Sequence, residues 1–164
     1  MADQIEITGE MKAQIGQQSP PWDYEVTTTS VRAFARGVGY SDPVYFDEAV
    51  ARTAGYRSLP APPTYLGTPI FLPGRSSDTF SRPTEGQPAI DHGLAGLLDG
   101  GTETETFRQI CAGDTLAVVV SITGLEVRDS KALGQMLIMT SETTFTDRTS
   151  GELAAVQHGQ AIFY

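Results

Sequence analysis

Three side chains that can exchange a proton stand within one short segment, GYSDPVY, at positions 39–45. They are Tyr40, Asp42 and Tyr45. A phenol has an unperturbed pKa near ~10, so at neutral pH a tyrosine donates hydrogen bonds but is a poor general base. Asp42 directly precedes a proline, and an Asp-Pro step favours a turn, which makes a turn residue the simpler interpretation of this carboxylate. The segment therefore offers proton donors without an evident base.

His92 is the most informative titratable residue outside this segment. Imidazole has an unperturbed pKa near ~6.5, which suits general acid–base catalysis, and Asp91 stands next to His92 in the chain. Neighbouring side chains often diverge, so an ordinary loop histidine is the competing interpretation. His158 falls in a predicted strand and is interpreted as a histidine of the sheet or of an interface.

Other reactive residue types have simpler interpretations. Glu103 and Glu105 have strand spacing and share a face, which is either a solvated sheet face or a set of interface or pocket carboxylates near Asp99. Cys111 has no paired base and is interpreted as a small hydrophobic residue before a turn. The glycine pair at 100–101 lacks the frame of a phosphate loop and is interpreted as a bulge or turn.

The first half of the chain predicts helices. Apolar residues follow the i, i+3, i+4, i+7 spacing of an amphipathic helix over 31–38. Asp47 and Glu48 open a second short helix, where negative charge suits the helix dipole. The other predicted elements are a strand over 22–28, the second helix over 47–54 and a short buried helix over 64–71.

The second half predicts an antiparallel sheet. Segments rich in β-branched residues and separated by short turns cover 102–109, 115–128, 135–146 and 153–163. Helices followed by consecutive strands indicate an α+β domain. Residues 73–99 form a long loop rich in Gly, Pro, Ser and Thr, of the kind that is either functional or disordered. We expect a single domain over 16–164 that follows an N-terminal extension over 1–15.

Composition narrows the class of protein and its partners. The net charge is −9 over 164 residues, which argues against nucleic acid and against an anionic membrane as partners. No apolar run approaches the ~18 residues of a membrane-spanning helix. Cys111 is the only cysteine and no zinc-ligand spacing occurs, so we expect a reducing, cytoplasmic setting with no disulfide, metal or cofactor.

Three stretches, in their order and spacing, resemble the N-terminal, half-domain branch of the MaoC-like dehydratases. VRAFARGVGYSDPVYFDEAVARTAGY (31–56) is similar to the family's helix, overhanging segment and second helix. APPTY (61–65) is similar to the approach to its buried helix, and LDGGTETETFRQICAGDTL (98–116) to the strand that follows. The resemblance covers about 16–163. It implies the hotdog fold, an antiparallel sheet wrapped around a central helix, which pairs with a second hotdog unit through its sheet.

The resemblance implies hydration or dehydration of an acyl thioester, usually an enoyl-CoA. This chemistry needs a base to activate water, an acid to protonate the α-carbon and amide donors for the enolate-like oxygen. Active relatives carry an aspartate and a histidine in a segment reading roughly Gly-Asp-x-Asn-Pro-x-His. Tyr40 and Tyr45 occupy those two positions here, so the catalytic dyad is absent from its expected place.

A second departure lies at the start of the buried helix. Active relatives have a glycine there whose N–H faces the thioester oxygen, whereas this chain has a proline pair that ends at Pro63, and proline has no N–H. Carried over from the family, the residues expected to contact substrate are Phe46, Pro63, Thr64 and Tyr65.

These observations leave three functional hypotheses. The leading one is a subunit of an acyl-CoA hydratase or dehydratase that pairs with a homologous, dyad-bearing hotdog subunit in a heterodimer or heterotetramer. The second is a homodimeric enzyme with a site rebuilt from His92, Asp42, Tyr40 and Tyr45. The third is a non-enzymatic, acyl-binding hotdog domain.

Overall fold

The computed structural model describes residues 4–68 and 85–164. The strands are β1 (Trp22–Glu25), β2 (Leu97–Thr106), β3 (Thr115–Ser130), β4 (Gly134–Asp147) and β5 (Leu153–Phe163). The helical elements are α1 (Gly9–Ala13), α2 (Thr28–Val38), η1 (Pro43–Tyr45), α3 (Glu48–Thr53) and η2 (Tyr65–Gly67), of which η1 and η2 are 3-10 turns. The α+β class predicted from the sequence is confirmed.

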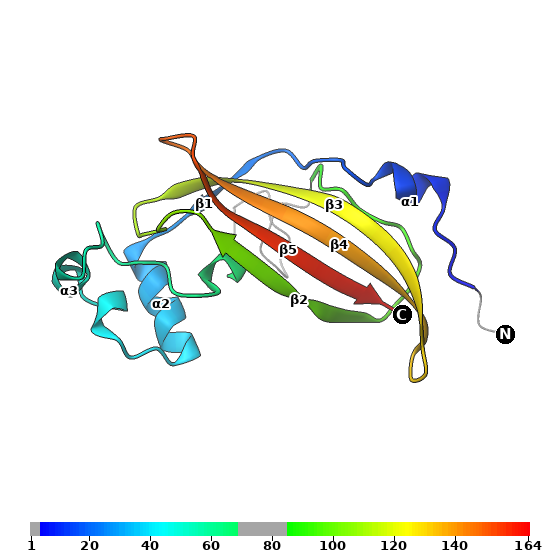
Figure 1. Ribbon diagram of the computed structural model, residues 1–164, viewed down its shortest axis with the longest axis horizontal. Coiled ribbons are helices and arrows are strands. Elements are labelled where there is room, and N and C mark those ends of the chain that lie inside the picture. The colour runs from blue at the N-terminus through cyan, green and yellow to red at the C-terminus, as the bar shows by residue number, and fades with distance from the viewer. Residues whose placement is uncertain (1–3, 69–84) are drawn as a thin grey trace.

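The strands form one curved antiparallel sheet in the order β1-β3-β4-β5-β2. Of the four consecutive strands predicted from the sequence, β3, β4 and β5 pair in chain order as a meander, whereas β2 pairs with β5 and not with β3. Strands β1 and β2 are the two edges of the sheet. Figure 1 shows α2 and α3 gathered at one end of the sheet, whereas α1 and the C-terminus lie toward the other end. None of the helices in the described parts of the chain is long and apolar enough to cross a membrane.

Alternation along β3 separates the two faces of the sheet. Leu116, Val118 and Val120 are buried, and the residues between them are partly exposed. Val118 pairs with Phe145 of β4, which is also buried, so both belong to what we call the inner face of the sheet. The hydrophobic core lies against this face.

Helix α2 ends with the predicted range of 31–38 but begins three residues before it, at Thr28. Thr27 Oγ1 accepts a hydrogen bond from the Ser30 N–H at 3.0 Å, and Ser30 Oγ accepts one from the Thr27 N–H at 3.0 Å, which is a reciprocal capping box. Gly39 ends the helix with φ of 86°, a left-handed conformation that suits glycine. The cap also explains why the strand predicted over 22–28 ends at Glu25: the residues that follow belong to the helix start.

An aromatic cluster joins the helices to the inner face of the sheet. Tyr24 of β1 meets Tyr65 and Phe145 edge to face, with ring centroids 5.9 Å and 6.1 Å apart, and Tyr65 meets Phe34 of α2 at 5.6 Å. The Tyr24 hydroxyl donates to the carbonyl oxygens of Tyr65 at 3.0 Å and Thr68 at 3.3 Å. Burial raises the pKa of both Tyr24 and Tyr65 above the ordinary tyrosine value, so both stay neutral.

Strand β2 starts earlier than its sequence pattern indicates, at Leu97 instead of Thr102. The pairing register with β5 shifts between Asp99 and Gly101, which confirms the bulge predicted at the glycine pair. Asp99 Oδ1 accepts a hydrogen bond from the Gly101 N–H at 2.8 Å, and Gly101 has φ of 114°. Because β2 is exposed along its whole length, it lacks the apolar alternation by which a strand is recognised in sequence.

The buried helix predicted over 64–71 lies only partly within the described residues. Its first part forms the single 3-10 turn η2, in which Tyr65 and Leu66 are buried. The remainder, and residues 73–84 of the predicted long loop, lie outside the described residues. Asp47 caps α3 by accepting hydrogen bonds from the Ala49 N–H at 2.7 Å and the Val50 N–H at 3.3 Å, as its interpretation as a helix-start residue requires.

We predict that Tyr24→Phe lowers the free energy of unfolding by about 1–2 kcal/mol, because it removes the hydroxyl that donates to the Tyr65 and Thr68 carbonyl oxygens while it preserves the ring contacts. Urea denaturation followed by circular dichroism measures this change. Tyr40→Phe removes a hydroxyl from a more exposed ring and serves as the matched control, with a change within about 0.5 kcal/mol. Equal midpoints for the two variants contradict the role given to the Tyr24 hydroxyl.

Candidate functional site

The segment that carries the tyrosine pair is a tight, capped connection between α2 and α3. The Tyr40 N–H donates to the Ala35 carbonyl at 2.9 Å, which completes the left-handed end of α2. Asp42 Oδ1 accepts a hydrogen bond from the Val44 N–H at 3.0 Å and so caps η1. This contact matches the interpretation of Asp42 as a turn residue, since its carboxylate is used by the local backbone.

Tyr40 and Tyr45 lie against each other. Their ring centroids are 5.3 Å apart with the planes tilted by 41°. Tyr45 is partly buried against the core, and Tyr40 is more exposed. Burial raises the pKa of Tyr45, and the neighbouring Tyr40, Tyr56 and Asp42 add to this effect. The Tyr45 phenol therefore stays neutral at physiological pH and can donate a proton in a hydrogen bond, but cannot act as a general base.

Thr64 stands at the start of the predicted buried helix in an unusual conformation. Its φ is 66° and ψ is 1°, the only left-handed non-glycine residue in the two described ranges. Such a conformation in a β-branched residue is strained and persists only where its surroundings impose it. The surrounding backbone is indeed tied down: the Ala61 N–H donates to the Ile110 carbonyl at 2.8 Å, and the Tyr65 N–H to the Pro62 carbonyl at 3.1 Å.

The residues predicted to contact substrate occupy different environments. Tyr65 is 2% exposed, and its hydroxyl lies 2.6 Å from Ser30 Oγ, so it is a core residue. Phe46 is half-buried, and its carbonyl accepts a hydrogen bond from Arg32 Nε at 3.0 Å. Pro63 is exposed. Of this set, Thr64 lines a cavity on the inner face.

His92 lies apart from the tyrosine pair within one chain. Its ring stacks on Phe163 with centroids 4.0 Å apart, and its Nδ1 accepts a hydrogen bond from the Leu94 N–H at 3.0 Å. Phe163 is the last residue of β5, at the end of the sheet away from α2 (Figure 1). A single chain therefore does not bring His92 together with Tyr40 and Tyr45.

A cavity of about 520 Å³ opens on the inner face between β1, η2 and the middle of β2, β4 and β5. Its apolar wall includes Trp22, Leu66, Val120, Met139 and Phe145. Its polar wall includes Thr102, Thr104, Ser141, Thr143, Gln157 and Gln160. These polar residues carry no distinguishing signal in the sequence, because Thr and Ser in strands are ordinary on a solvated face.

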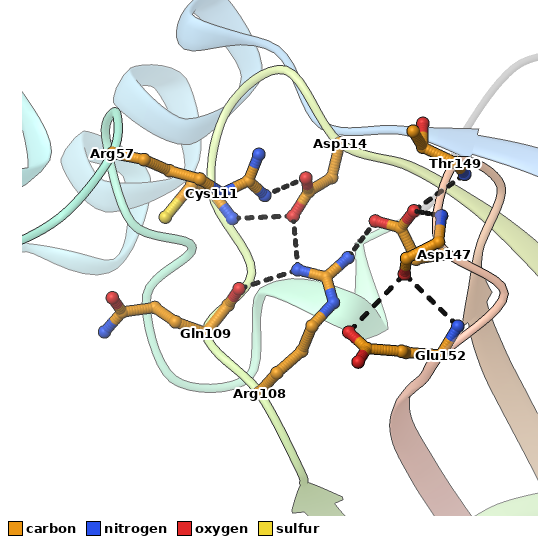
Figure 2. A network of polar contacts seen from close by, with 9 residues as sticks. Arg57, Arg108, Gln109, Cys111, Asp114, Asp147, Thr149 and Glu152 are labelled. Carbon is orange, nitrogen blue, oxygen red and sulfur yellow. Dashed lines mark hydrogen bonds and ion pairs between the residues drawn. The ribbon is translucent and has the colours of Figure 1, made fainter.

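A second polar cluster lies where β3 begins, around the buried carboxylate of Asp114 (Figure 2). Asp114 Oδ2 accepts hydrogen bonds from the Cys111 N–H at 3.0 Å and from Arg108 at 3.0 Å, and Arg57 pairs with Oδ1. Arg108 also pairs with Asp147 at the end of β4. Three separate chain segments thus meet at this one cluster.

This cluster positions the loop that leads to Thr64. Arg57 belongs to that loop, and the Ala112 N–H donates to the Leu59 carbonyl at 2.8 Å next to the Asp114 turn. Both carboxylates of the cluster, Asp114 and Asp147, are paired with arginines and are therefore not available as catalytic groups. The cluster is therefore a support for the site.

We predict that Asp114→Asn lowers the free energy of unfolding by about 2–3 kcal/mol, since it leaves two guanidinium groups without their shared charge partner. The expected loss of stability is smaller than that for a fully buried ion pair, because the Arg57 side chain is 54% exposed. Denaturant midpoints measure the change, and Asp129→Asn at an exposed position is the matched control. Indistinguishable midpoints for the two variants contradict the supporting role.

We predict that Asp147 makes the protein sensitive to acid. Hydrogen bonds from the Ser150 N–H at 2.8 Å and the Thr149 N–H at 2.7 Å, together with Arg108, hold the pKa of the Asp147 carboxyl below its ordinary value of 3.8. A carboxyl group whose pKa is lowered in the folded state stabilises the fold at pH values above its ordinary pKa. This stabilisation is lost as the pH falls through the pKa of the folded state. Urea midpoints should thus drop less below about pH 4 in Asp147→Asn than in the parent. An identical drop contradicts the prediction.

The family described as the FAS1-like, dehydratase domain region matches residues 13–156 of this chain. A UPF0336 protein of Parafrankia sp. (strain EAN1pec) is 31% identical over 132 residues, which are 80% of this chain and 79% of that protein. The chain belongs to the FAS1-like dehydratase-region family. This FAS1-like dehydratase-region protein is also 26% identical to a probable enoyl-CoA hydratase alpha subunit of Thermomonospora curvata, over 84% of this chain and 44% of that one.

Solved structures of similar fold are MaoC-like dehydratases and related hotdog subunits. A MaoC-like dehydratase is 27% identical with a TM-score of 0.71, over 93% of this chain, which spans only 42% of that one. The ChsH1-ChsH2 complex from Mycobacterium tuberculosis gives a TM-score of 0.75 at 18% identity and covers 94% of this FAS1-like protein and 93% of the matched chain. The truncated HadBC complex, a (3R)-hydroxyacyl-ACP dehydratase from the same organism, gives 0.67 at 22% identity, with coverages of 91% and 96%. The predicted hotdog fold is confirmed.

Proposed function

We propose that this protein is a subunit of an acyl-thioester hydratase or dehydratase of the enoyl-CoA type, and that it leaves the acid–base step to a homologous partner. The observation that carries this proposal is the tyrosine pair. Tyr40 and Tyr45 stand where active relatives carry an aspartate and a histidine, and the Tyr45 phenol has a raised pKa. A phenol is a poor general base at physiological pH, because its ordinary pKa lies near ~10, so a pair of phenols does not replace a carboxylate and an imidazole.

The chemistry defines what the partner must supply. In hydration, a base takes one proton from water, the water oxygen forms a bond to the β-carbon of the enoyl thioester, and an acid delivers a proton to the α-carbon. Dehydration is the reverse of these steps. In this chain, Asp42 caps a turn and Pro63 lacks an N–H for the thioester oxygen, so base, acid and oxyanion donor all fall to the partner.

The surface along β2 supports pairing with another hotdog subunit. β2 is an edge strand whose residues are all exposed, and a long unpaired edge invites a further strand. Large apolar side chains accompany it: Leu97 is 62% exposed, Phe107 52% and Leu153 42%. The ChsH1-ChsH2 and HadBC structures are complexes of two different chains, which favours a heterodimer or a heterotetramer over a homodimer.

We predict that the purified chain alone hydrates no enoyl-CoA, and that activity appears on mixing it with a MaoC-like subunit encoded in the same genome that carries the Gly-Asp-x-Asn-Pro-x-His segment. Loss of the enoyl-thioester absorbance measures the rate, and light scattering after gel filtration measures the mass of each species. The double variant Tyr40→Phe, Tyr45→Phe should keep the activity of the mixture within about twofold, since neither hydroxyl takes part in proton transfer.

Two outcomes contradict this proposal. Full activity of the chain alone, lost on His92→Ala with folding intact, establishes the rebuilt homodimeric site in its place. Binding of acyl-CoA without turnover in any mixture, including one that forms a stable complex, establishes a non-enzymatic acyl-binding domain.

A further inference from the structure

We infer that the inner-face cavity selects acyl groups that carry a neutral, hydrogen-bond-accepting oxygen, such as a hydroxyl or keto group, remote from the thioester. This inference rests on the proposed function, because it treats the cavity as the place where the acyl group of the thioester lies. It goes further in naming which acyl groups fit and which residues choose them.

The cavity contains two buried donors without partners. Trp22 is 5% exposed, and its indole N–H has no hydrogen-bond partner among the described residues. The Thr68 hydroxyl oxygen is buried and equally unpartnered in that part of the chain. Both residues line the cavity. Buried polar groups in proteins are nearly always hydrogen-bonded, because an unmet donor costs about 1–3 kcal/mol, so two such groups beside one cavity point to a ligand.

The chemistry of the donors restricts the ligand atom. An indole N–H donates and never accepts, so its partner must be an acceptor. Among the described residues that line the cavity there is no Lys, Arg or His, and Asp99 is the only carboxylate. An anionic group would therefore be taken out of water without a countercharge, whereas a hydroxyl or carbonyl oxygen is not penalised in this way.

The sheet supplies hydroxyl groups and room on the same face. Cross-strand pairing aligns Thr143 of β4 with Gln157 of β5 and Thr104 of β2, and the Gln157 side-chain amide donates to Thr104 Oγ1 at 3.1 Å. Two residues further along β5, Gly159 pairs with Ser141 of β4 on one side and with Thr102 of β2 on the other. A side chain at Gly159 would place its Cβ 3.0 Å from Ser141 Oγ, so the glycine keeps this part of the cavity open.

The cavity has the volume of a small-molecule site, and its lining is partly apolar and partly polar. About 520 Å³ lies within the range of roughly 300–1,000 Å³ that is typical of ligand pockets. Apolar residues such as Val120, Met139 and Phe145 suit a hydrocarbon frame, and the hydroxyl rows suit a few oxygen substituents. A plain alkyl chain fills the volume but leaves the Trp22 and Thr68 donors unmet.

The sole tryptophan makes this inference directly measurable. Trp22 is the only tryptophan of the chain, so the tryptophan emission, recorded apart from that of the tyrosines, reports on the cavity and does not depend on catalysis. We would titrate the full chain with decanoyl-CoA, 10-hydroxydecanoyl-CoA and 9-oxodecanoyl-CoA. The expected result is that an oxygenated thioester binds about five- to tenfold more tightly than decanoyl-CoA, the gain from one hydrogen bond to a buried donor.

The variants locate the effect. Thr68→Val should bring the preference for the oxygenated thioesters to about twofold or less while it keeps the fluorescence signal. Trp22→Phe, followed by calorimetry, should do the same. Thr144→Val is the matched control: Thr144 pairs with Val119 and Val156 on the outer face and should leave the preference unchanged.

The outcomes separate this inference from the proposed function. Equal affinity for all three thioesters, or a preference that Thr68→Val leaves intact, overturns the selection of oxygenated acyl groups. Absence of any fluorescence change overturns the assignment of the cavity as an acyl site. Neither result bears on whether activity appears on mixing with a dyad-bearing subunit, which is the test of the proposed function.

Discussion

A carboxylate removed from water must be neutralised where it stands, and the arrangement of this fold around Asp114 follows from that requirement. Its side chain is 2% exposed and gathers donors from the loop before η2, from the segment after β2 and from its own turn. Through Arg108 the same cluster reaches Asp147 at the end of β4. The chain that leads to Thr64 is thereby fixed against the sheet, and the left-handed conformation of Thr64 is held by its surroundings.

The tyrosine pair has a different physical character from an aspartate–histidine dyad. A carboxylate and an imidazole are stabilised by hydration and by the attraction between their charges, whereas two phenols are stabilised by ring contact and by burial. The connection between α2 and α3 is accordingly a packed, capped turn in which the side chain of Asp42 accepts a hydrogen bond from the backbone.

Local signals were sufficient for much of the fold. The sequence signals that predicted these elements depend on residues close in sequence. They are the apolar spacing of α2, the acidic start of α3 and the β-branched runs of β3, β4 and β5. The start of β2 could not be predicted in the same way, because an edge strand exposed on both faces shows no alternation and its glycine bulge resembles a loop. The bulge itself was evident from the glycine pair.

The candidate site was less predictable than the fold for a related reason. The tyrosine pair is visible in the sequence, since it depends on two positions of one segment. The ion pairs around Asp114 depend on contacts between distant segments: Asp114 pairs with Arg57 and Arg108, and Arg108 also pairs with Asp147. A charged residue in a sequence does not indicate which distant residue it will pair with. The Trp22 and Thr68 donors, which have no partner among residues 4–68 and 85–164, are likewise a property of packing, because an indole N–H is unremarkable in a sequence.

The burial of Cys111 makes its alkylation rate a measure of how often the Asp114 turn opens. The thiol is 0% exposed, lies in the turn that the carboxylate holds closed and belongs to the only cysteine of the chain. An alkylating reagent thus reacts only with molecules in which the turn has opened, and its rate follows the population of that open form when reclosing is fast. Comparison of this rate with global unfolding separates the loosening of one corner from the loss of the whole fold.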